Sequence, residues 1–265
     1  MNVQNPSESL TAIVLTRNEA PNIGRCLEAL RWVPRVLVVD SHSDDGTVEI
    51  ARSFPNTSVV QREFDTFAGQ CNHALGLVSS EWVLSFDADY VLTPELSTEI
   101  QSLRNVDADA FRATFTYCIH GHPLRGTLYP PRAVLYRKSA ARYEDFGHGH
   151  RVHISGRTEG LKHRVLHDDR KPLSRWFHNQ LRYACEEADF LESGEEQKFT
   201  FTDKMRRAIV PAPLLVGPYV LFAQGCLLDG WPGWHYTMQR VLAEVLISLE
   251  LVDRKLAGIG KQRVR

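Results

Sequence analysis

The amino-acid sequence predicts an α/β fold in which a mixed, mostly parallel sheet is flanked by helices and followed by a helical carboxy-terminal appendage. Apolar runs alternate with amphipathic helical stretches over the first 90 of 265 residues, which is the order that builds parallel sheets. Polar clusters follow these runs at 16–19, 40–45 and 87–89, where such sheets bind their ligands. A composition with 43% hydrophobic and 24% charged residues excludes disordered, collagen-like and disulfide-scaffold proteins.

Each predicted strand is a short apolar run that stops at polar residues. Strands are predicted at 10–15, 36–40, 58–61 and 81–86, and helices at 21–30, 48–54 and 70–77. In the first helix Ile23, Leu27 and Leu30 share one face, and Pro21 suits the first turn. We therefore expect this helix to pack on the sheet.

The two halves of the chain differ in charge. Residues 1–110 carry 7 arginines, no lysine and 16 acidic residues, a net charge of −9, whereas the remainder carries +8. An acidic front half suits metal binding, and a basic back half suits a phosphate or an anionic membrane surface. The alternative is that both sets of charges are solvated surface residues with no binding role. The basic residues form no RNA- or DNA-binding motif, so no nucleic-acid partner is expected.

The pattern predicts two regions. The first spans 8–170, with a front half at 8–110 and a back half of antiparallel strands and loops at 111–170. Residues 171–265 are expected to be helical, because apolar residues recur at helical spacing in two stretches of this region.

Residues 208–228 contain no charged side chain, and Lys204, Arg206 and Arg207 precede them. These 21 residues match the length of a membrane span, but three prolines and two glycines interrupt them. A helix pair that docks on an anionic membrane surface fits the pattern better than a clean span, and a buried core is the other alternative.

The cysteines and the amino terminus indicate a cytoplasmic protein. The five cysteines show no C-x-x-C spacing, and no basic region precedes the first apolar run. We therefore expect reduced thiols and no signal peptide, with the chain in the cytoplasm or on the cytoplasmic face of the inner membrane.

Asp87-Ala88-Asp89 is the sharpest motif, at the end of the fourth predicted strand. Two carboxylates two residues apart can face one cation where the strand ends, and oxygen ligands of this kind suit Mg²⁺ or Mn²⁺. Such sites also use substrate phosphates as ligands, which predicts a nucleotide diphosphate. A turn, or a cap for the helix after Thr93, is the alternative interpretation.

Asp40 is a second carboxylate at a strand end. Acids at this place in nucleotide-binding sheets accept hydrogen bonds from a base or ribose. Asp45, in the turn that follows, is equally well explained as a helix cap.

Together these segments resemble the front half of family 2 glycosyltransferases, which have the GT-A fold. The resemblance rests on LTAIVLTRNEAPNIGRCLEAL, VLVVDSHSDDGTVEIA and FAGQCNHALGLVSSEWVLSFDADYVL in this order. It continues more loosely through LKHRVLHDDRKPLSRWFHNQLRYACEEA and is similar to the subgroup of lipopolysaccharide-core glucosyltransferases.

The resemblance implies a metal-dependent, inverting sugar transfer. The donor would be a nucleotide-diphosphate sugar, UDP-linked in the common pattern, and the acceptor a cell-envelope polysaccharide or glycolipid, as in lipopolysaccharide or exopolysaccharide biosynthesis. It makes 8–110 the nucleotide-binding half and 111–170 the acceptor-side half, whereas the membrane association expected of 171–265 comes from the uncharged segment and its basic flank.

The resemblance also implies roles for single residues in the front half. Thr16, Asn18 and Glu19 would line the nucleotide pocket, and Asp40 would recognise the base.

A second set of implied residues surrounds the diphosphate and the sugar. Asp87 and Asp89 would hold the metal, and His167 would complete that site unless it is a structural histidine. Gln70 and Asn72 match a polar helix face near the sugar.

The catalytic base is not settled by the family pattern. That pattern has a His-Glu pair before V-x-x-x-G, whereas this chain reads GHGHRVHISG. We prefer Asp145 as the base and His148 second, with Glu144 and His150 as the remaining alternatives.

Three arginines border an aromatic, proline-containing turn at 129–131. Arg125, Arg132 and Arg137 are candidates to bind a phosphorylated or lipid-linked acceptor, or are surface charges on a strand.

Two other classes of function remain open. VLSFDADYV satisfies the D-x-D-x-[TV] signature of haloacid-dehalogenase-type phosphatases, but that motif ends the first strand of its fold, and here two strand–helix units precede it. The missing His-Glu pair also permits a nucleotide-sugar-binding protein that has no catalytic activity.

Overall fold

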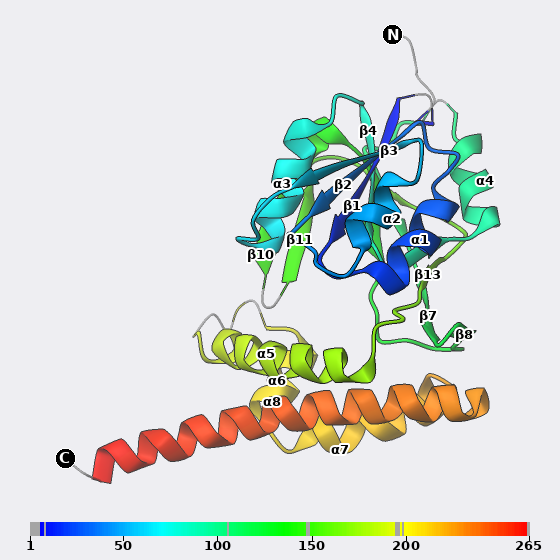
Figure 1. The fold of residues 1–265 in the computed structure, drawn as a ribbon. Coiled ribbons are helices and arrows are strands. Elements are labelled where there is room, and N and C mark those ends of the chain that lie inside the picture. Colours follow the sequence, from blue (N-terminus) through cyan, green and yellow to red (C-terminus); the bar gives the residue numbers. More distant parts are fainter. Residues whose placement is uncertain are drawn as a thin grey trace. The chain divides into compact units, whose positions relative to one another are not determined.

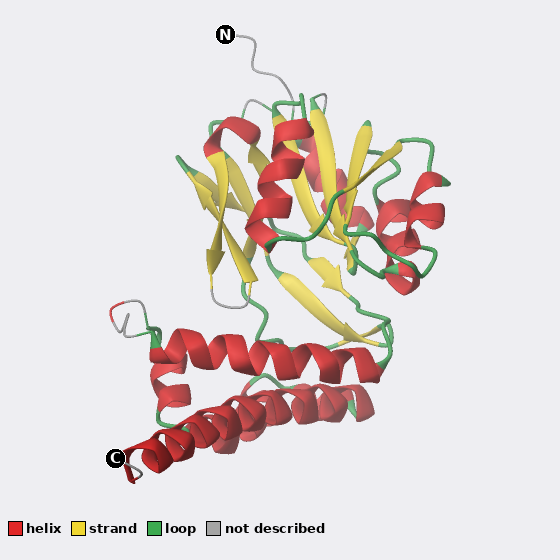
Figure 2. Cartoon of the chain, turned by 60° about the vertical axis from the view of Figure 1, so that its left-hand side comes forward, coloured by secondary structure: helices red, strands yellow, loops and turns green. Residues whose placement is uncertain are grey.

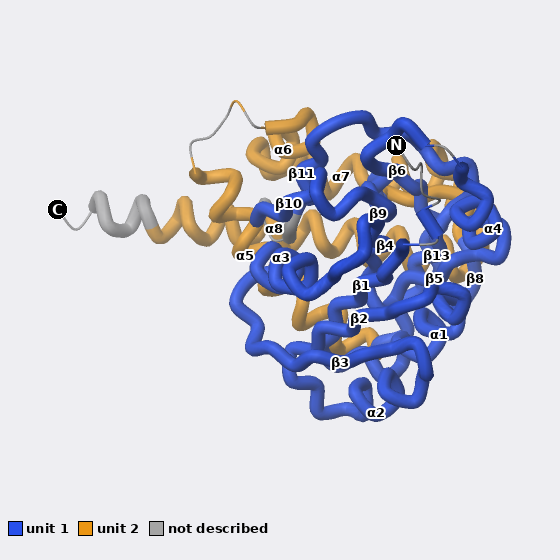
Figure 3. Tube along the Cα trace, turned by 90° about the horizontal axis from the view of Figure 1, so that it is seen from above, with its two compact units in different colours: residues 1–123, 129–171 blue, residues 124–128, 172–265 orange. Residues whose placement is uncertain are grey.

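The structure, a computed structural model, describes residues 6–7, 9–104, 106–146, 149–193, 197 and 199–263, and only the backbone of 146, 149, 150 and 258–263. The chain divides into two compact units (Figure 3). Residues 1–123 and 129–171 form the sheet unit, and residues 124–128 and 172–265 form the helical unit.

A seven-stranded mixed sheet forms the centre of the sheet unit, with the order β12-β6-β9-β4-β1-β2-β3 (Figures 1 and 2). The strand β1 pairs in parallel with β2 and β4, and β2 pairs in parallel with β3. The strand β9 runs antiparallel between β4 and β6. The strands are β1 (Leu10–Thr16), β2 (Arg35–Asp40), β3 (Thr57–Gln61), β4 (Trp82–Asp87), β6 (Ala110–Ala113), β9 (Arg132–Arg137) and β12 (Thr158–Gly160).

Both faces of this sheet are covered, because side chains of the central strands are apolar on both sides. Ala12 and Val14 of β1 pack in one cluster with α1, α2 and α4, whereas Ile13 packs with α3, β10 and β11 on the other face (Figure 1). The covering elements are α1 (Ala20–Ala29), α2 (Thr47–Arg52), α3 (Phe67–Leu77), α4 (Pro94–Ser102) and the hairpin β10 (Ala141–Phe146) and β11 (Gly149–Ile154), with a 3₁₀ turn at Lys138–Ala140.

A smaller four-stranded sheet follows the order β5-β13-β7-β8. Its strands are β5 (Tyr90–Leu92), β7 (Phe115–Ile119), β8 (His122–Pro123) and β13 (Val165–His167). The strand β13 is antiparallel to β5, and His167 lies opposite Tyr90. Tyr90 directly follows the Asp87-Ala88-Asp89 motif in the sequence, so His167 lies near that motif.

Local signals explain where two helices begin. Thr66 and Thr93 cap α3 and α4 by accepting hydrogen bonds from Gly69 N and Leu96 N at 3.0 and 3.2 Å. Since Thr93 caps α4 itself, the cap interpretation of Asp87 and Asp89 has no support in the hydrogen bonds of the described residues.

The helical unit comprises α5 (Leu173–Glu192), α6 (Phe201–Arg207), α7 (Pro211–Pro218), the π-helical η3 (Tyr219–Ala223), the 3₁₀ helix η4 (Cys226–Asp229) and α8 (Trp231–Arg263). Ala188 and Leu191 of α5 pack against Ile247 and Leu251 of α8. Arg206 of α6 binds Glu187 and Glu244, both nearly buried, so one guanidinium joins three helices.

The uncharged segment 208–228 forms short helices rather than one continuous helix. The prolines that begin and end α7 agree with this interruption. No helix in the described part of the chain is both long enough and apolar enough to cross a lipid bilayer.

Candidate active site at the carboxyl end of the sheet

The carboxyl ends of β1, β2 and β4 lie side by side (Figure 1). In the parallel register Thr16 pairs with Asp40, and Leu15 pairs with Asp87. The loops after these strands therefore meet at one edge of the sheet, as expected for a ligand site of this fold class.

The Asp40 carboxylate is completely buried and fixes the loop after β2. Its Oδ1 accepts hydrogen bonds from Thr16 Oγ1 (2.8 Å) and Ser43 Oγ (2.5 Å). Its Oδ2 accepts from Ser43 N (2.9 Å) and from Gln61 Nε2 (3.3 Å). All of its usual acceptor positions are thus engaged within the protein, and its contact with a base stays a prediction.

The loops after β1 and β2 interlock through hydrogen bonds from backbone N–H groups to side-chain oxygens of the other loop. Asn18 has a positive φ of 56°, and its N–H donates to Ser43 Oγ while its side-chain oxygen accepts from Asp44 N. The Asp45 carboxylate accepts the N–H of Ala20 at 3.0 Å, so it caps α1 as well as its own turn. Asn18 is therefore held at the edge of the sheet where the nucleotide pocket is predicted.

Asp89 and His167 form the pair that lies deepest at this edge. His167 Nε2 lies 3.2 Å from Asp89 Oδ2, and both side chains are nearly buried. Burial alone would raise the pKa of Asp89, but the charge and hydrogen bond of His167, together with Lys171, lower it below its ordinary value. Asp89 is therefore an anion at neutral pH.

One oxygen of this carboxylate, Asp89 Oδ1, is buried without a hydrogen-bond partner. A buried anionic oxygen without a partner is unfavourable unless a ligand completes it, and a divalent cation fits it. Within the described residues, no three His, Cys, Asp or Glu side chains already lie close enough to enclose a metal ion. Asp87, half-buried at the end of β4, is the nearest further carboxylate along the chain.

Aromatic rings hold the His167 imidazole in place. The rings of Tyr117 and Tyr129 have their centroids 4.7 Å from that of His167, and Tyr90 lies at 5.2 Å. Tyr90 and Tyr129 also hydrogen-bond each other through their hydroxyls. The imidazole orientation is thus set by packing rather than by solvent.

The segment after β13 joins this edge to α1 through ion pairs that sequence reasoning missed. Lys171 Nζ lies 2.6 Å from Glu19 Oε1, and Asn22 Nδ2 donates to the other Glu19 oxygen at 2.8 Å. Burial raises the pKa of Glu19 to about 7, against the opposing charge of Lys171, and the neighbouring Asp89 adds to the rise. The Glu19 carboxylate therefore already has two partners in this network, and it lies in the loop where the nucleotide pocket is predicted.

Asp168 is the second anchor of the same segment. Its carboxylate binds Arg25 at 2.7 Å and Arg170 at 2.9 Å, and accepts the N–H of Gly121 at 3.1 Å. Burial would raise the pKa of Asp168, but Arg170 and Arg25 outweigh it and lower the pKa below the ordinary value.

Gln70 and Asn72, predicted near the sugar, point to different partners. Gln70 is buried and donates to Ser41 Oγ at 3.1 Å, beside the loop after β2. Asn72 exchanges two hydrogen bonds with the backbone of Tyr143 and so fastens α3 to β10. Their sugar contacts stay a prediction, and they do not share one face.

The candidate bases lie on the hairpin β10–β11. Asp145 is exposed, and its Oδ1 accepts the N–H of Ala68 at the start of α3 at 3.1 Å. Glu144 is also exposed on the preceding residue of β10. His150 pairs with Asp145 in the backbone register, whereas His148 lies outside the described residues.

Of the three arginines singled out by sequence, only Arg132 lies in the sheet unit at this edge. Arg125 belongs to the helical unit and binds Asp229. Arg137 lies at the opposite end of β9 and pairs with Glu81.

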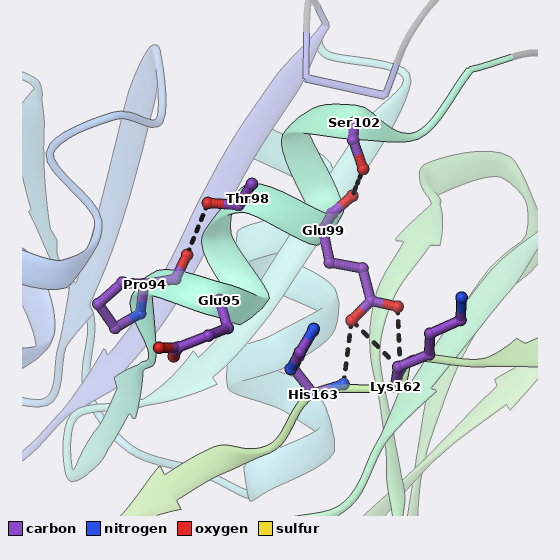
Figure 4. A pocket seen from close by; sticks show the side chains of 7 residues that line it. All are labelled: Pro94, Glu95, Thr98, Glu99, Ser102, Lys162 and His163. Atoms are coloured by element: carbon purple, nitrogen blue, oxygen red, sulfur yellow. Dashed lines mark hydrogen bonds between the residues drawn. The ribbon is translucent and has the colours of Figure 1, made fainter.

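The sheet unit also has a shallow hollow of about 550 Å³ beside α4, away from the strand ends (Figure 4). Glu99 accepts the backbone N–H groups of Lys162 and His163 there, so its carboxylate is occupied in joining α4 to this loop. The hollow brings together no set of groups that suggests chemistry.

Residues 11–161 match the family model described as Glycosyl transferase family 2, which is more than half of the chain. The chain belongs to glycosyltransferase family 2. The matched range includes all the strand-end motifs, so the family resemblance and the enzyme class predicted from sequence are confirmed. Family membership also argues against the phosphatase alternative.

Known proteins similar to this glycosyltransferase include an uncharacterized glycosyltransferase of Rickettsia felis, 37% identical over 95 residues. That match covers 36% of this chain and 33% of the relative. The lipopolysaccharide core biosynthesis glycosyltransferase LpsC of Rhizobium meliloti is 31% identical over 88 residues, 32% of this chain and 33% of LpsC. The matched segments thus span about a third of the length of these two relatives.

Among solved structures, the mannosyltransferase PcManGT of Pyrobaculum calidifontis, in complex with GDP-Man and Mn²⁺, has a similar fold. The TM-score is 0.53 at 17% identity, and the alignment covers 95% of this chain and 90% of PcManGT. The predicted GT-A fold is confirmed.

Asp168→Asn tests the charge network of this glycosyltransferase. Because the folded-state pKa of Asp168 lies below the ordinary 3.8, its contribution to stability is present above about pH 4 and is lost as the pH falls further. We expect the free energy of unfolding of the variant at pH 7 to be about 1.5–3 kcal/mol lower than that of the wild type. Below about pH 4 the stability of the variant should fall less steeply with pH than that of the wild type.

Thermal unfolding between pH 7 and pH 2 measures this difference. Asp107→Asn is the matched control, because Asp107 is almost fully exposed and its one ion pair among the described residues is with the exposed Arg157. A variant with the wild-type acid profile would show that Asp168 does not carry this pH dependence.

Proposed function

We propose that this chain transfers a sugar from a UDP-linked donor to a polysaccharide or glycolipid of the cell envelope. The observation that carries the proposal is the ionised Asp89 carboxylate, with one buried oxygen unpartnered, at the edge where β1, β2 and β4 end. The name of LpsC, for lipopolysaccharide core biosynthesis, supports the envelope acceptor. The PcManGT complex with GDP-Man and Mn²⁺ supports a nucleotide-sugar donor and a metal, whereas the choice of UDP rests on the family resemblance.

Asp87, Asp89 and His167 are the residues that would hold Mg²⁺ or Mn²⁺. When bound, the cation would neutralise charge on the leaving diphosphate. The tyrosines around His167 keep its ring beside Asp89, so these two groups need little rearrangement before a ligand arrives.

The remaining proposed donor contacts come from the interlocked loops. Thr16 and Asn18 are fixed by Asp40 and Ser43, which gives the nucleotide pocket a rigid wall. Lys171 keeps Glu19 in place at the same wall. Rigid placement reduces the entropy lost on donor binding.

The reaction proposed is a single displacement with inversion. Asp145 takes the proton of the acceptor hydroxyl, the acceptor oxygen bonds to the anomeric carbon, and the bond from that carbon to the diphosphate oxygen breaks. Asp145 suits this role because Oδ1 is anchored by Ala68 N, while Oδ2 has no hydrogen bond among the described residues.

Titration with UDP, GDP and CDP tests the donor site. We expect UDP to bind more tightly with Mn²⁺ than without it, and the double variant Asp87→Ala plus Asp89→Ala to lose at least tenfold in affinity, because the cation loses its carboxylates. Calorimetry measures the binding.

The control for this titration is Glu95→Ala plus Glu99→Ala, which removes an acidic pair in the hollow beside α4. It should bind UDP as the wild type does. Binding that survives loss of Asp87 and Asp89 would contradict the proposed site, and binding without any turnover would favour the non-catalytic alternative.

Asp145→Asn tests the base. The amide oxygen can still accept the N–H of Ala68, so the variant should fold and bind UDP within about twofold of wild type, yet lose about 10²–10⁴-fold in turnover. UDP release from UDP-sugars in the presence of an envelope glycolipid extract measures turnover. Glu144→Gln is the matched control, and a loss there with normal Asp145→Asn would assign the base to Glu144.

Contact with an anionic membrane through the helical unit completes the proposal. The uncharged segment 208–228 follows the exposed Lys204 and Arg207, and many of its large apolar side chains face solvent. Phe222 is 70% exposed, and Trp231, just after the segment, is 84% exposed. Between η3 and α8 lies an apolar hollow of about 360 Å³ lined by residues such as Leu221 and Trp234. Exposed aromatic residues beside basic ones suit a lipid headgroup interface.

Sedimentation with vesicles tests membrane contact. The chain should bind vesicles that contain phosphatidylglycerol more strongly than phosphatidylcholine vesicles, and Phe222→Glu plus Trp231→Glu should abolish binding by removing apolar anchors. Leu77→Glu, at an exposed leucine of α3, is the control. Equal binding by all three proteins, or no binding to anionic vesicles, would refute the proposal.

A further inference from the structure

Arg132 carries a half-buried positive charge that forms no ion pair with any described acidic side chain. Its guanidinium carbon lies 4.7 Å from the centroid of the Tyr129 ring. In the described part of the chain, no carboxylate lies within ion-pair distance of it. Arg137, on the same strand, instead pairs with Glu81, and its Nε lies 3.8 Å from Asp109 Oδ1.

The strand register places Arg132 at the candidate site. In the antiparallel pair of β4 and β9, Trp82 lies opposite Arg137, so the end of β4 at Asp87 and the start of β9 at Arg132 share the other end of the pair. Tyr129, on which Arg132 stacks, also packs against His167 at 4.7 Å. One aromatic ring therefore separates the guanidinium from the pair of His167 and Asp89.

Keeping this cation without a partner is costly for the protein alone. A partly buried charge without an ion-pair partner loses hydration free energy that the surrounding protein does not replace. Stacking on a tyrosine ring recovers part of this free energy. Asp87 is close enough to favour the charged guanidinium, but it forms no hydrogen bond with it. The five N–H donors of Arg132 are thus available to an anion, and the planar guanidinium matches a phosphate group.

We propose that Arg132 binds a phosphate group of the substrate at the Asp87 end of the site. This inference rests on the proposed function and names a further binding residue for it. The phosphate is either the terminal phosphate of the donor diphosphate or a phosphate carried by the acceptor. Both present the same oxygens to the guanidinium, so the experiment must separate them.

The experiment compares Arg132→Gln with the wild type and with Arg137→Gln as the matched control. The probes are UDP, UMP, and inorganic phosphate added to protein already saturated with UDP, each with and without Mn²⁺. If the donor phosphate is the ligand, Arg132→Gln loses about 10–100-fold in affinity for UDP and less than twofold for UMP. If the acceptor phosphate is the ligand, UDP affinity is kept and inorganic phosphate no longer binds.

The control Arg137→Gln should bind all three probes as the wild type does. Arg132→Gln that binds UDP and inorganic phosphate like the wild type would overturn the inference and leave the donor site intact. If the wild type binds neither UDP nor UMP, the proposed function fails and this inference fails with it.

Thermal unfolding without ligand separates binding from a structural role. Arg132→Met removes an unpaired charge, so the melting temperature should stay unchanged or rise, while phosphate binding falls as in Arg132→Gln. A fall in melting temperature for Arg132→Met, with Arg132→Lys restoring stability but not changing phosphate affinity, would make Arg132 a structural residue and refute the inference.

Discussion

The compensation of buried negative charge at the carboxyl end of the sheet is the constraint on which the candidate site depends. Asp40, Asp89 and Asp168 are buried or nearly so, and an uncompensated buried carboxylate costs about 3–5 kcal/mol. Hydroxyl groups compensate Asp40, His167 compensates Asp89, and two arginines compensate Asp168. Segment 167–171 supplies partners for the loop after β1, for α1 and for β5, so its position fixes the relative placement of the loops that form the site.

The sequence predicted the part of the site that depends on local pattern. Parallel strands end at the same edge, so the apolar runs that stop before Thr16, Asp40 and Asp87 were sufficient to bring these residues together. The placement of His167 beside Asp89 came from the family resemblance rather than from spacing, because 78 residues separate the two.

The rest of the site could not be predicted, because it depends on contacts between residues that are far apart in the sequence. Lys171 and Glu19 are 152 residues apart, and no periodicity links them. Arg132 and Arg137 look equivalent in the sequence, yet the register of β9 sends one to the candidate site and the other to the opposite end of the strand. The fold likewise gives the buried Asp40 and the exposed Asn72 hydrogen-bond partners that their positions in the sequence did not suggest.

The most direct measurement of the central claim is a crystal structure with UDP and Mn²⁺, in which anomalous scattering locates the metal. The account predicts a manganese peak beside the Asp89 carboxylate, with the nucleotide against the loops after β1 and β2. A manganese peak in the hollow between Glu95 and Glu99, or a nucleotide bound away from the ends of β1, β2 and β4, would contradict it.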